Sequence, residues 1–367
     1  MKKTAIIISP NYKDYAKKYL EDCVDSIKKQ DSRGEIKIFI TDNATSSESF
    51  EFLNKVLDSR LRGNDIGKEL ILNKNNDGFA KGNNDAIKLA LVRDFDYIIL
   101  FNMDTVIDLN CVRELIKMAE SDEKIGAVQA RLMLYNEKDK INSLGNSTHF
   151  LGFGYCIGYQ EELDSHLRGN DTKEQKGDDT EIFYPSGAAV LFKREVLEKT
   201  GLFDEEFWMY NEDQDLGWRV WLAGYKCVLA YDAVVHHKYE FAKSIKQYYF
   251  MDRNRIIAIL KNYHILTLLL IMPAFVIMEF GLILFSLKTG WFKEKIKVWK
   301  YFLSPEKWIY LIKARKEVQK MRKIKDKEIV KMITGKIWYQ EVDDWKLRFI
   351  NPFFNLYWKI IKRLIIW

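Results

Sequence analysis

Cysteine is scarce in this chain of 367 residues. The four cysteines, Cys23, Cys111, Cys156 and Cys227, lie far apart and show neither CxxC nor CxH spacing. Cysteines that lie this far apart in the sequence offer no ligand set for structural zinc and no disulfide framework. The cysteine pattern therefore favours reduced thiols in a body that faces the cytosol.

The glycine signatures of common nucleotide sites are also missing. The chain has neither GxGxxG nor a P-loop, so the dinucleotide and ATPase fingerprints do not apply. A secretory leader is not apparent either. The start, MKKTAIIISP, is basic and then apolar, but Pro10 ends the apolar run after about one strand length. We expect a first strand there rather than a signal peptide.

A periodic repeat is missing too, although one short peptide occurs twice. LDSRLRGND at 57–65 and LDSHLRGND at 163–171 are identical at eight of nine positions, and nothing around them repeats. This excludes a solenoid or blade period. We expect two tolerated surface insertions, near 57–66 and 163–180, because loops accept added length at little thermodynamic cost.

What the first two-thirds of the chain does have is alternation of strand and helix patterns. Such alternation predicts an α/β fold with a mostly parallel sheet and helices on both faces. The expected strands are 4–9, 36–41, 69–72 and 97–101, and the expected helices are 14–29, 47–57 and 80–92.

Polar residues follow each of these strands. Because ligands of parallel sheets bind at the carboxyl ends of strands, four such loops in a row favour a shared ligand, although a plain loop explains any one alone. Asp104 could bind a divalent cation such as Mg²⁺ or Mn²⁺, or it could simply cap a helix, as Asp108 could. The loops are 10–12, 42–43, 76–84 and 102–104.

A helix start combines carboxylates with aromatic residues at 207–219, FWMYNEDQDLGWR. Asn211 is expected as the N-cap, with Glu212 and Asp213 in the first turn, where the helix dipole favours anions. The alternatives are ordinary capping and a general base that faces a sugar-sized substrate. Asp215 and Arg219 are expected to form an i,i+4 ion pair on a helix face.

Together these motifs resemble the family 2 inverting glycosyltransferases of the GT-A fold, a Rossmann-like fold, and especially their rhamnosyl- and galactofuranosyl-transferase-like branch. The resemblance covers roughly residues 4–260, with the motifs in family order. The matching stretches are SPNY (9–12), TDNAT (41–45), NNDGFAKGNN (75–84), FNMDT (101–105), SGAAVLFKR (186–194), GLFDEEFWMYNEDQDLGWR (201–219), AVVHHKY (233–239) and YYFMDRNR (248–255).

The resemblance implies a role for each matching residue. Asp213 would be the general base with Glu212 as its neighbour, Trp208 would form part of the acceptor wall, and Asp104 would be the retained carboxylate of a DxD-type site for Mg²⁺ or Mn²⁺. Asn102 stands where a stricter DxD has its first Asp. The implied donor-binding residues are Pro10, Tyr12, Asp42, Asn43, Asn76, Gly78, Asn84, Asp104, Gly187 and Ala188.

A histidine of the pair His236 and His237 would complete the metal site of the family, and imidazole is a reasonable Mn²⁺ ligand. Adjacent strand residues point to opposite faces, so at most one of the two should serve. We slightly favour His236.

The character of the chain changes after residue 260, so we expect a catalytic domain at 1–260 and a helical membrane-associating region at 261–367. Residues 265–287 have only Thr267, Glu279 and Ser286 as polar side chains and could cross a bilayer once, whereas a buried core helix is the plainer alternative. The segment 288–331 is basic and 351–367 is amphipathic. Both flanks of the apolar segment look cytosolic, which favours a peripheral or re-entrant arrangement on anionic lipids at the cytoplasmic side of the cell membrane.

We therefore expect an enzyme that moves a sugar, rhamnose-like or another hexose, from a nucleotide diphosphate sugar to a hydroxyl of a lipid-linked or growing bacterial surface glycan. No nucleic acid partner is expected. The alternatives are a sugar nucleotidyltransferase and a catalytically inactive membrane scaffold with the same fold.

Overall fold

The computed structural model describes residues 2–31, 34–61, 66–164, 180–239, 245–337 and 345–367. Residues 165–179, which hold most of the second copy of the repeated peptide, lie outside this range. The first copy begins inside a helix rather than in a loop, because α2 (Ser47–Leu61) continues to Leu61 and buries Leu57.

One mixed sheet forms the centre of the molecule, in the order β10-β12-β6-β11-β4-β1-β2-β3. Its first half confirms the predicted alternation, because β1 (Lys3–Asn11), β2 (Glu35–Asn43), β3 (Gly67–Asn73) and β4 (Tyr97–Phe101) are parallel. The helices between them are α1 (Tyr15–Lys28), α2 and α3 (Gly78–Val92).

The second half of the sheet is not purely parallel. β11 (Ala189–Lys193) runs antiparallel between β4 and β6 (Ile125–Leu134), and β12 (Lys226–His237) is parallel to β6. The remaining strands are β5 (Thr105–Ile107), β7 (Ile141–Ser143), β8 (Asn146–Thr148), β9 (Gly154–Cys156) and β10 (Thr180–Glu181).

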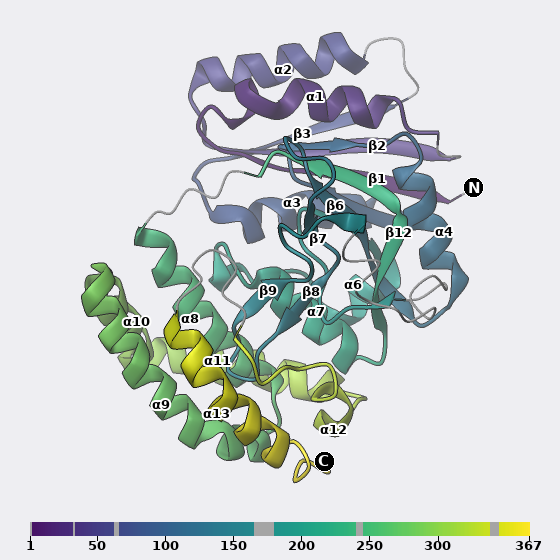
Figure 1. Ribbon diagram of the computed structural model, residues 1–367. Coiled ribbons are helices and arrows are strands. Elements are labelled where there is room, and N and C mark those ends of the chain that lie inside the picture. Colours follow the sequence, from purple (N-terminus) through teal and green to yellow (C-terminus); the bar gives the residue numbers. More distant parts are fainter. Residues whose placement is uncertain (1, 32–33, 62–65, 165–179, 240–244, 338–344) are drawn as a thin grey trace.

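Helices cover both faces of the sheet, so it has two core layers. Alternation along β1 sends Ile6 and Ile8 to one layer and Ala5 and Ile7 to the other. The first layer lies under α1, α2 and α4 (Cys111–Ser121), and α1 and α2 lie above the sheet in Figure 1. The second layer lies against α3, α6 (Arg194–Thr200) and α7 (Glu212–Leu222).

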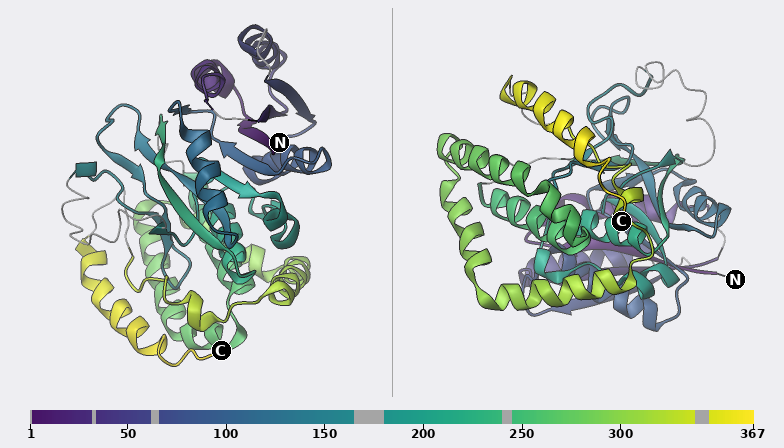
Figure 2. Two further views of the ribbon diagram at one scale, coloured as in Figure 1. Left: turned by 90° about the vertical axis from the view of Figure 1, so that its right-hand side faces the viewer. Right: turned by 90° about the horizontal axis from the view of Figure 1, so that it is seen from below.

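The C-terminal third is helical, as expected, and packs on the side of the sheet away from α1 and α2 (Figures 1 and 2). The predicted apolar segment is α9 (Ile265–Thr289), and the predicted amphipathic segment overlaps α13 (Trp345–Ile361). The other helices there are α8 (Ile245–Asn262), α10 (Phe292–Leu303), α11 (Pro305–Met321) and α12 (Asp326–Ile329), and the short helix η2 (Glu205–Phe207) comes before α7.

Candidate active site

The loops after β1 and β2 are joined by buried side chains at one edge of the sheet. Asn11 donates from Nδ2 to Oδ1 of Asp42 at 2.8 Å, and Asp42 also accepts hydrogen bonds from Thr45. Asn43 donates from Nδ2 to the carbonyl of Gly78 at 3.1 Å, at the start of α3. The predicted donor residues Asp42 and Asn43 are therefore brought together with the loop after β3.

Close backbone approach fixes the start of α3 beside β1. A Cβ on Gly82 would lie 2.4 Å from Cγ of Pro10, so only glycine allows this contact. Gly78 has φ +86° and its amide donates to Oδ1 of Asn76 at 3.2 Å. Tyr12, the other predicted donor contact on this edge, is 44% exposed.

Asn84 has a different position from the one expected. It is buried, its Nδ2 donates to the carbonyl of Phe203 at 2.8 Å, and its Oδ1 accepts from the amide of Phe203. A third bond joins Nδ2 to Glu205. These bonds occupy both ends of the amide, so Asn84 positions the segment before η2 instead of offering a free group to a donor.

Asp104 lies next to His237, not His236. The distance between Nε2 of His237 and Oδ1 of Asp104 is 3.2 Å, and Nδ1 of His237 is 2.9 Å from Oδ1 of Asn142. His236 points elsewhere, with its Nε2 3.4 Å from Asp108. The slight preference for His236 is thereby corrected, because β12 alternation sends the two rings to opposite faces.

The electrostatics of Asp104 suit a charged ligand site. Burial raises the pKa of Asp104, but the hydrogen bond and charge of His237, together with hydrogen bonds from Tyr15 and the backbone, outweigh burial and leave the pKa below its usual value. A divalent cation could replace this contact, since a carboxylate oxygen and an imidazole nitrogen are both ligands for such metals.

The residues present fit a divalent cation only in part. Among the described residues no three His, Cys, Asp or Glu side chains gather at one point. Asn102 adds an oxygen, since within the described part of the chain its buried Oδ1 has no hydrogen-bond partner. Mg²⁺ and Mn²⁺ accept such a small oxygen and nitrogen set when substrate phosphates complete the shell.

The first turn of α7 presents the predicted base to this edge. Oδ2 of Asp213 accepts from the amide of Gly187 at 3.3 Å, and Oδ1 accepts from the amide of Gln214 at 2.8 Å. Burial nevertheless raises the pKa of Asp213 to about 6. Ala188, next to Gly187, accepts at its carbonyl from the amide of Asn102 at 2.9 Å, which joins the predicted base to the loop that carries Asp104.

Glu212 is more deeply buried than Asp213. Burial, and then the charge of Asp213, raise the pKa of Glu212 well above its usual value. Its Oε2 has no hydrogen-bond partner among the residues that the structure describes. Both effects favour the protonated form of Glu212, so it can share the base role less readily than Asp213.

The segment before α7 has an unusual backbone. Trp208, Tyr210 and Asn211 have φ of +63°, +67° and +63°, which is uncommon for residues with a Cβ. Asn211 takes the predicted N-cap position, but within the described chain its side chain makes no capping bond and donates to Oε1 of Gln214 instead. Non-glycine residues at positive φ cost energy and cluster at functional sites.

Two residues of α8 hold this strained segment, and sequence reasoning assigned them no role. Asn254 donates from Nδ2 to the carbonyls of Phe207, Met209 and Tyr210 at 2.7–2.9 Å. Arg253 donates to the carbonyl of Phe207 at 3.1 Å. Their only signal in the sequence was the YYFMDRNR motif, which contains both.

Trp208 connects the donor loop to α8. Its carbonyl accepts from the amide of Ala80 at 3.1 Å, and its ring stacks on Phe250 with centroids 4.9 Å apart. A Cβ on Gly78 would lie 2.5 Å from the Trp208 carbonyl oxygen. The predicted acceptor-wall residue therefore lies directly against the predicted donor loop.

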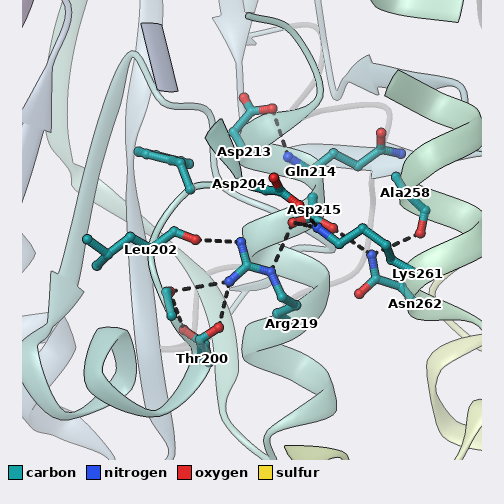
Figure 3. Close-up of polar contacts among 12 residues, drawn as sticks. Thr200, Leu202, Asp204, Asp213, Gln214, Asp215, Arg219, Ala258, Lys261 and Asn262 are labelled. Carbon is teal, nitrogen blue, oxygen red and sulfur yellow. Dashed lines mark hydrogen bonds and ion pairs between the residues drawn. The ribbon is translucent and has the colours of Figure 1, made fainter. Parts of the chain in front are cut away.

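Asp215 makes the predicted ion pair with Arg219 at 2.9 Å, but the pair is buried rather than on a helix surface. Lys261 and Asn262 of α8 also bind Asp215, at 3.0 and 2.9 Å (Figure 3). Arg219 donates in addition to the carbonyls of Thr200 and Leu202. Figure 3 shows Asp213 pointing away from this cluster.

Comparison with known proteins identifies the family of this chain. Residues 6–201, just over half of the chain, match the sequence family Glycosyl transferase family 2. A stretch of 54 residues is 44% identical to N-acetylglucosaminyl-diphospho-decaprenol L-rhamnosyltransferase of Mycobacterium tuberculosis. That match covers 14% of this chain and 18% of the relative, so the chain aligns with less than a fifth of that protein.

Solved structures share the fold at low sequence identity. S. aureus TarS 1-349 in complex with UDP has a TM-score of 0.50 and 15% identity, covering 100% of this chain and 90% of its own. GalNAc-T7 with UDP, GalNAc and Mn2+ has a TM-score of 0.50 and 14% identity, covering 69% of this chain and 48% of its own. These structures support the GT-A-type fold. With more than half of its length matching the family, the chain belongs to glycosyl transferase family 2.

Proposed function

We propose that this protein is an inverting glycosyltransferase that uses a nucleotide diphosphate sugar, with Asp213 as its general base. The observation that carries the proposal is the Asp213 carboxylate, with its pKa raised to about 6, joined through Gly187 and Ala188 to the Asp104 loop. A base with a pKa near the working pH is the most effective at taking a proton in a transition state.

In the proposed reaction, the acceptor hydroxyl oxygen attacks the anomeric carbon of the donor sugar. The bond from that carbon to the diphosphate oxygen breaks, and the hydroxyl proton passes to Asp213. Attack on the face opposite the leaving group inverts the anomeric configuration without a covalent enzyme intermediate. The sheet-edge residues Asp42, Asn43 and Gly78 would hold the nucleotide, and Trp208 would limit where the acceptor lies.

A divalent cation would be held by Asp104 and His237, and the side-chain oxygen of Asn102 would offer a further ligand. When bound, it would stabilise negative charge on the leaving diphosphate. Asn142 orients the His237 ring through Nδ1.

We infer that the acceptor is a lipid-linked or growing surface glycan and that the sugar is rhamnose-like or another hexose. The short rhamnosyltransferase match supports this inference.

A cavity of about 120 Å³ next to the first turn of α7 offers room for part of an acceptor; its lining includes Asn211, Tyr248, Asp252 and Arg255. The protein would act at the cytoplasmic side of the cell membrane, attached peripherally or by a re-entrant segment.

Substitution of the base tests this function. The purified protein is first screened against nucleotide sugars with Mn²⁺ or Mg²⁺, with thermal stabilisation as the readout of donor binding. With the donor that binds, Asp213→Asn should reduce transfer by about 10²–10⁴-fold. Donor stabilisation should remain, because Asp213 does not hold the nucleotide.

Three results would contradict the proposal. The first is that no nucleotide sugar binds with either metal. Another is release of pyrophosphate from a sugar phosphate and a nucleoside triphosphate, which would identify a nucleotidyltransferase. The third is unchanged surface glycan in cells that carry Asp213→Asn, which would indicate an inactive scaffold.

A further inference from the structure

Helix α9 exposes an uninterrupted apolar stripe along its length. Leu269, Val276, Ile277, Phe280 and Leu284 are each 54–63% exposed and recur at spacings of three, four and seven residues. Only 17% of the most apolar part of α9 is buried, although the helix is long and apolar enough to cross a membrane. A core helix would be mostly buried, so this stripe is not part of the core.

Helix α13, which contacts α9, exposes a second set of apolar side chains. Its exposed side chains include Phe353, Leu356 and Ile360, which are 55–62% exposed. The two helices touch, because the Tyr357 hydroxyl donates to the carbonyl of Leu270 in α9 at 2.6 Å. Figure 1 shows both at the end of the molecule farthest from α1 and α2.

The middle of α9 is fixed to the protein interior by charge. Glu279 binds Lys295 of α10 at 2.6 Å and also pairs with Arg255 of α8. Both cations bind Asp252 at 2.7 Å as well, and both are almost completely buried. The four charges balance, so removing Glu279 from them would leave buried cations without full compensation.

This attachment argues against a transmembrane path for α9. If α9 crossed the bilayer, Glu279, two residues from the middle of the helix, would lie near the depth where charges are most costly. In the structure the exposed side chains of α9 are apolar as far as Leu287, and Glu279 points inward with only 17% of its side chain exposed. An in-plane helix with one apolar face satisfies both observations.

The charge of the two helices indicates which surface they meet. Residues 265–289 and 345–367 contain six Lys or Arg and one acidic residue, Glu279. Lys288, Lys359 and Arg363 are exposed at the ends of the apolar stripes. Basic residues that flank an apolar face are attracted to anionic lipid headgroups.

We infer that α9 and α13 together form a monotopic docking surface for an anionic phospholipid bilayer, with α9 lying in the plane of one leaflet and not crossing it. This inference rests on the membrane association in the proposed function and specifies its geometry. A lipid-linked acceptor would then approach Asp213 from the leaflet on which the protein lies.

Vesicle binding tests the surface. The full chain is sedimented with vesicles of phosphatidylcholine and phosphatidylglycerol, and the double variant Ile277→Gln with Phe280→Gln should lower the partition constant by about tenfold or more. The matched control is Val92→Gln with Leu109→Gln, which removes two side chains of similar exposure (79% and 59%) from other faces. The control should bind as wild type does.

Cysteine labelling tests the in-plane geometry. Ile265→Cys and Thr289→Cys, at the two ends of α9, are introduced singly with Cys156→Ser into cells that express the full chain. A membrane-impermeant maleimide should label both positions in inside-out vesicles and neither in intact spheroplasts. Labelling of either position in spheroplasts would show a crossing and overturn the inference.

Two other outcomes would also overturn it. One is failure of the wild-type protein to bind the vesicles, or equal binding of the wild type and the double variant. The other is a dimeric wild type and a monomeric double variant in light scattering. That result would assign the face to a second copy of the chain. Loss of sugar transfer with vesicle binding intact would count against the enzymatic proposal and leave this surface standing.

Discussion

Asp213 and Asp215 differ by two positions and have opposite environments. Two residues turn an α-helix by about 200°, so their side chains leave α7 on nearly opposite sides. Asp213 faces the sheet edge, where it accepts hydrogen bonds from two backbone amides and forms no ion pair with any of the described residues. Asp215 faces α8 and lies between Arg219 and Lys261.

The raised pKa of Asp213 predicts opposite pH effects on activity and stability. As pH rises through about 6, Asp213 loses its proton and becomes a base, so kcat/KM should rise with an apparent pKa near this value. Because the folded protein holds the Asp213 proton more tightly than the unfolded chain does, the protonated carboxyl contributes to the stability of the fold. This contribution is complete below about pH 3.8, the ordinary pKa of Asp, and is lost as pH rises through about 6.

Asp213→Asn should therefore raise the free energy of unfolding at pH 7.5, by about 1 kcal/mol after allowance for one weakened backbone hydrogen bond. Urea unfolding at pH 4 and pH 7.5 measures this, with the gain smaller at pH 4. An equal or larger gain at pH 4 would contradict the assignment.

Asp215→Ala should destabilise the protein, in contrast to Asp213→Asn. The substitution leaves Arg219 and Lys261 buried with fewer counter-charges, a loss of about 3–5 kcal/mol. Thermal unfolding of both variants at the same pH provides the matched comparison. If Asp215→Ala unfolds at the wild-type temperature, the cluster in Figure 3 does not stabilise the fold.

His237 and His236 form a second matched pair of neighbours. His237→Ala should weaken the activation of transfer by Mn²⁺, raising the metal concentration for half-maximal rate by about 10-fold or more, because loss of one ligand lowers affinity. His236→Ala should change it little, since His236 pairs with Asp108. Mn²⁺ titration of activity and of donor-free thermal stability measures both; equal effects would contradict the assignment.

At the scale of elements, the strained segment 208–211 lies between α3 and α8. Its carbonyls are held by Asn254 and Arg253, and the Trp208 ring lies between the Gly78 loop and Phe250. α8 also carries Lys261 and Asn262, which bind Asp215. One helix therefore supports both sides of the α7 start, so the position of Asp213 depends on α8 as much as on α7.

A methyl group at Gly78 should disturb this arrangement. The methyl group of Gly78→Ala would collide with the Trp208 carbonyl, and alanine would have to adopt the positive φ of Gly78. The substitution should lower the free energy of unfolding by about 1–3 kcal/mol and weaken donor binding. Gly281→Ala is the control, because no atom of the described structure lies within 4 Å of a Cβ there and alanine favours a helix. Unfolding and donor titration compare them; similar stability of the two variants would contradict the crowding.

At the scale of the whole molecule, one apolar core continues from the sheet into the C-terminal helices. It includes Ala5 of β1, Met278 of α9 and Trp358 of α13. Trp358 stacks on Phe150 at 4.9 Å, and its Nε1 donates to the carbonyl of Ile333 at 2.9 Å. The proposed boundary near residue 260 therefore lies in a continuous packed interior.

Trp358→Ala should destabilise the catalytic part as well as α13. Loss of a buried tryptophan costs about 3–5 kcal/mol, and a shared core unfolds as one unit. Calorimetry should show one transition at lower temperature, whereas Trp308→Ala, at a 43% exposed side chain, should shift it little. Two separate transitions in the wild type would contradict a shared core.

The sequence by itself determined the features that depend on local patterns. The parallel strands β1 to β4, their helices, the loops at their carboxyl ends and the length of α9 follow from periodicity and turn residues within short windows. Asp213 at a helix start was visible in the same way. These features agree with the structure because each depends on neighbours along the chain.

Only the tertiary structure decided which partners these residues meet. Asn84 is bound by Phe203, 119 positions later, and His237 rather than His236 faces Asp104 because of the β12 register. β11 enters the sheet antiparallel, and Glu279 turns inward to Arg255 and Lys295. Such contacts join segments far apart in the chain, and hydrophobic periodicity carries no information about which distant residue a side chain will meet.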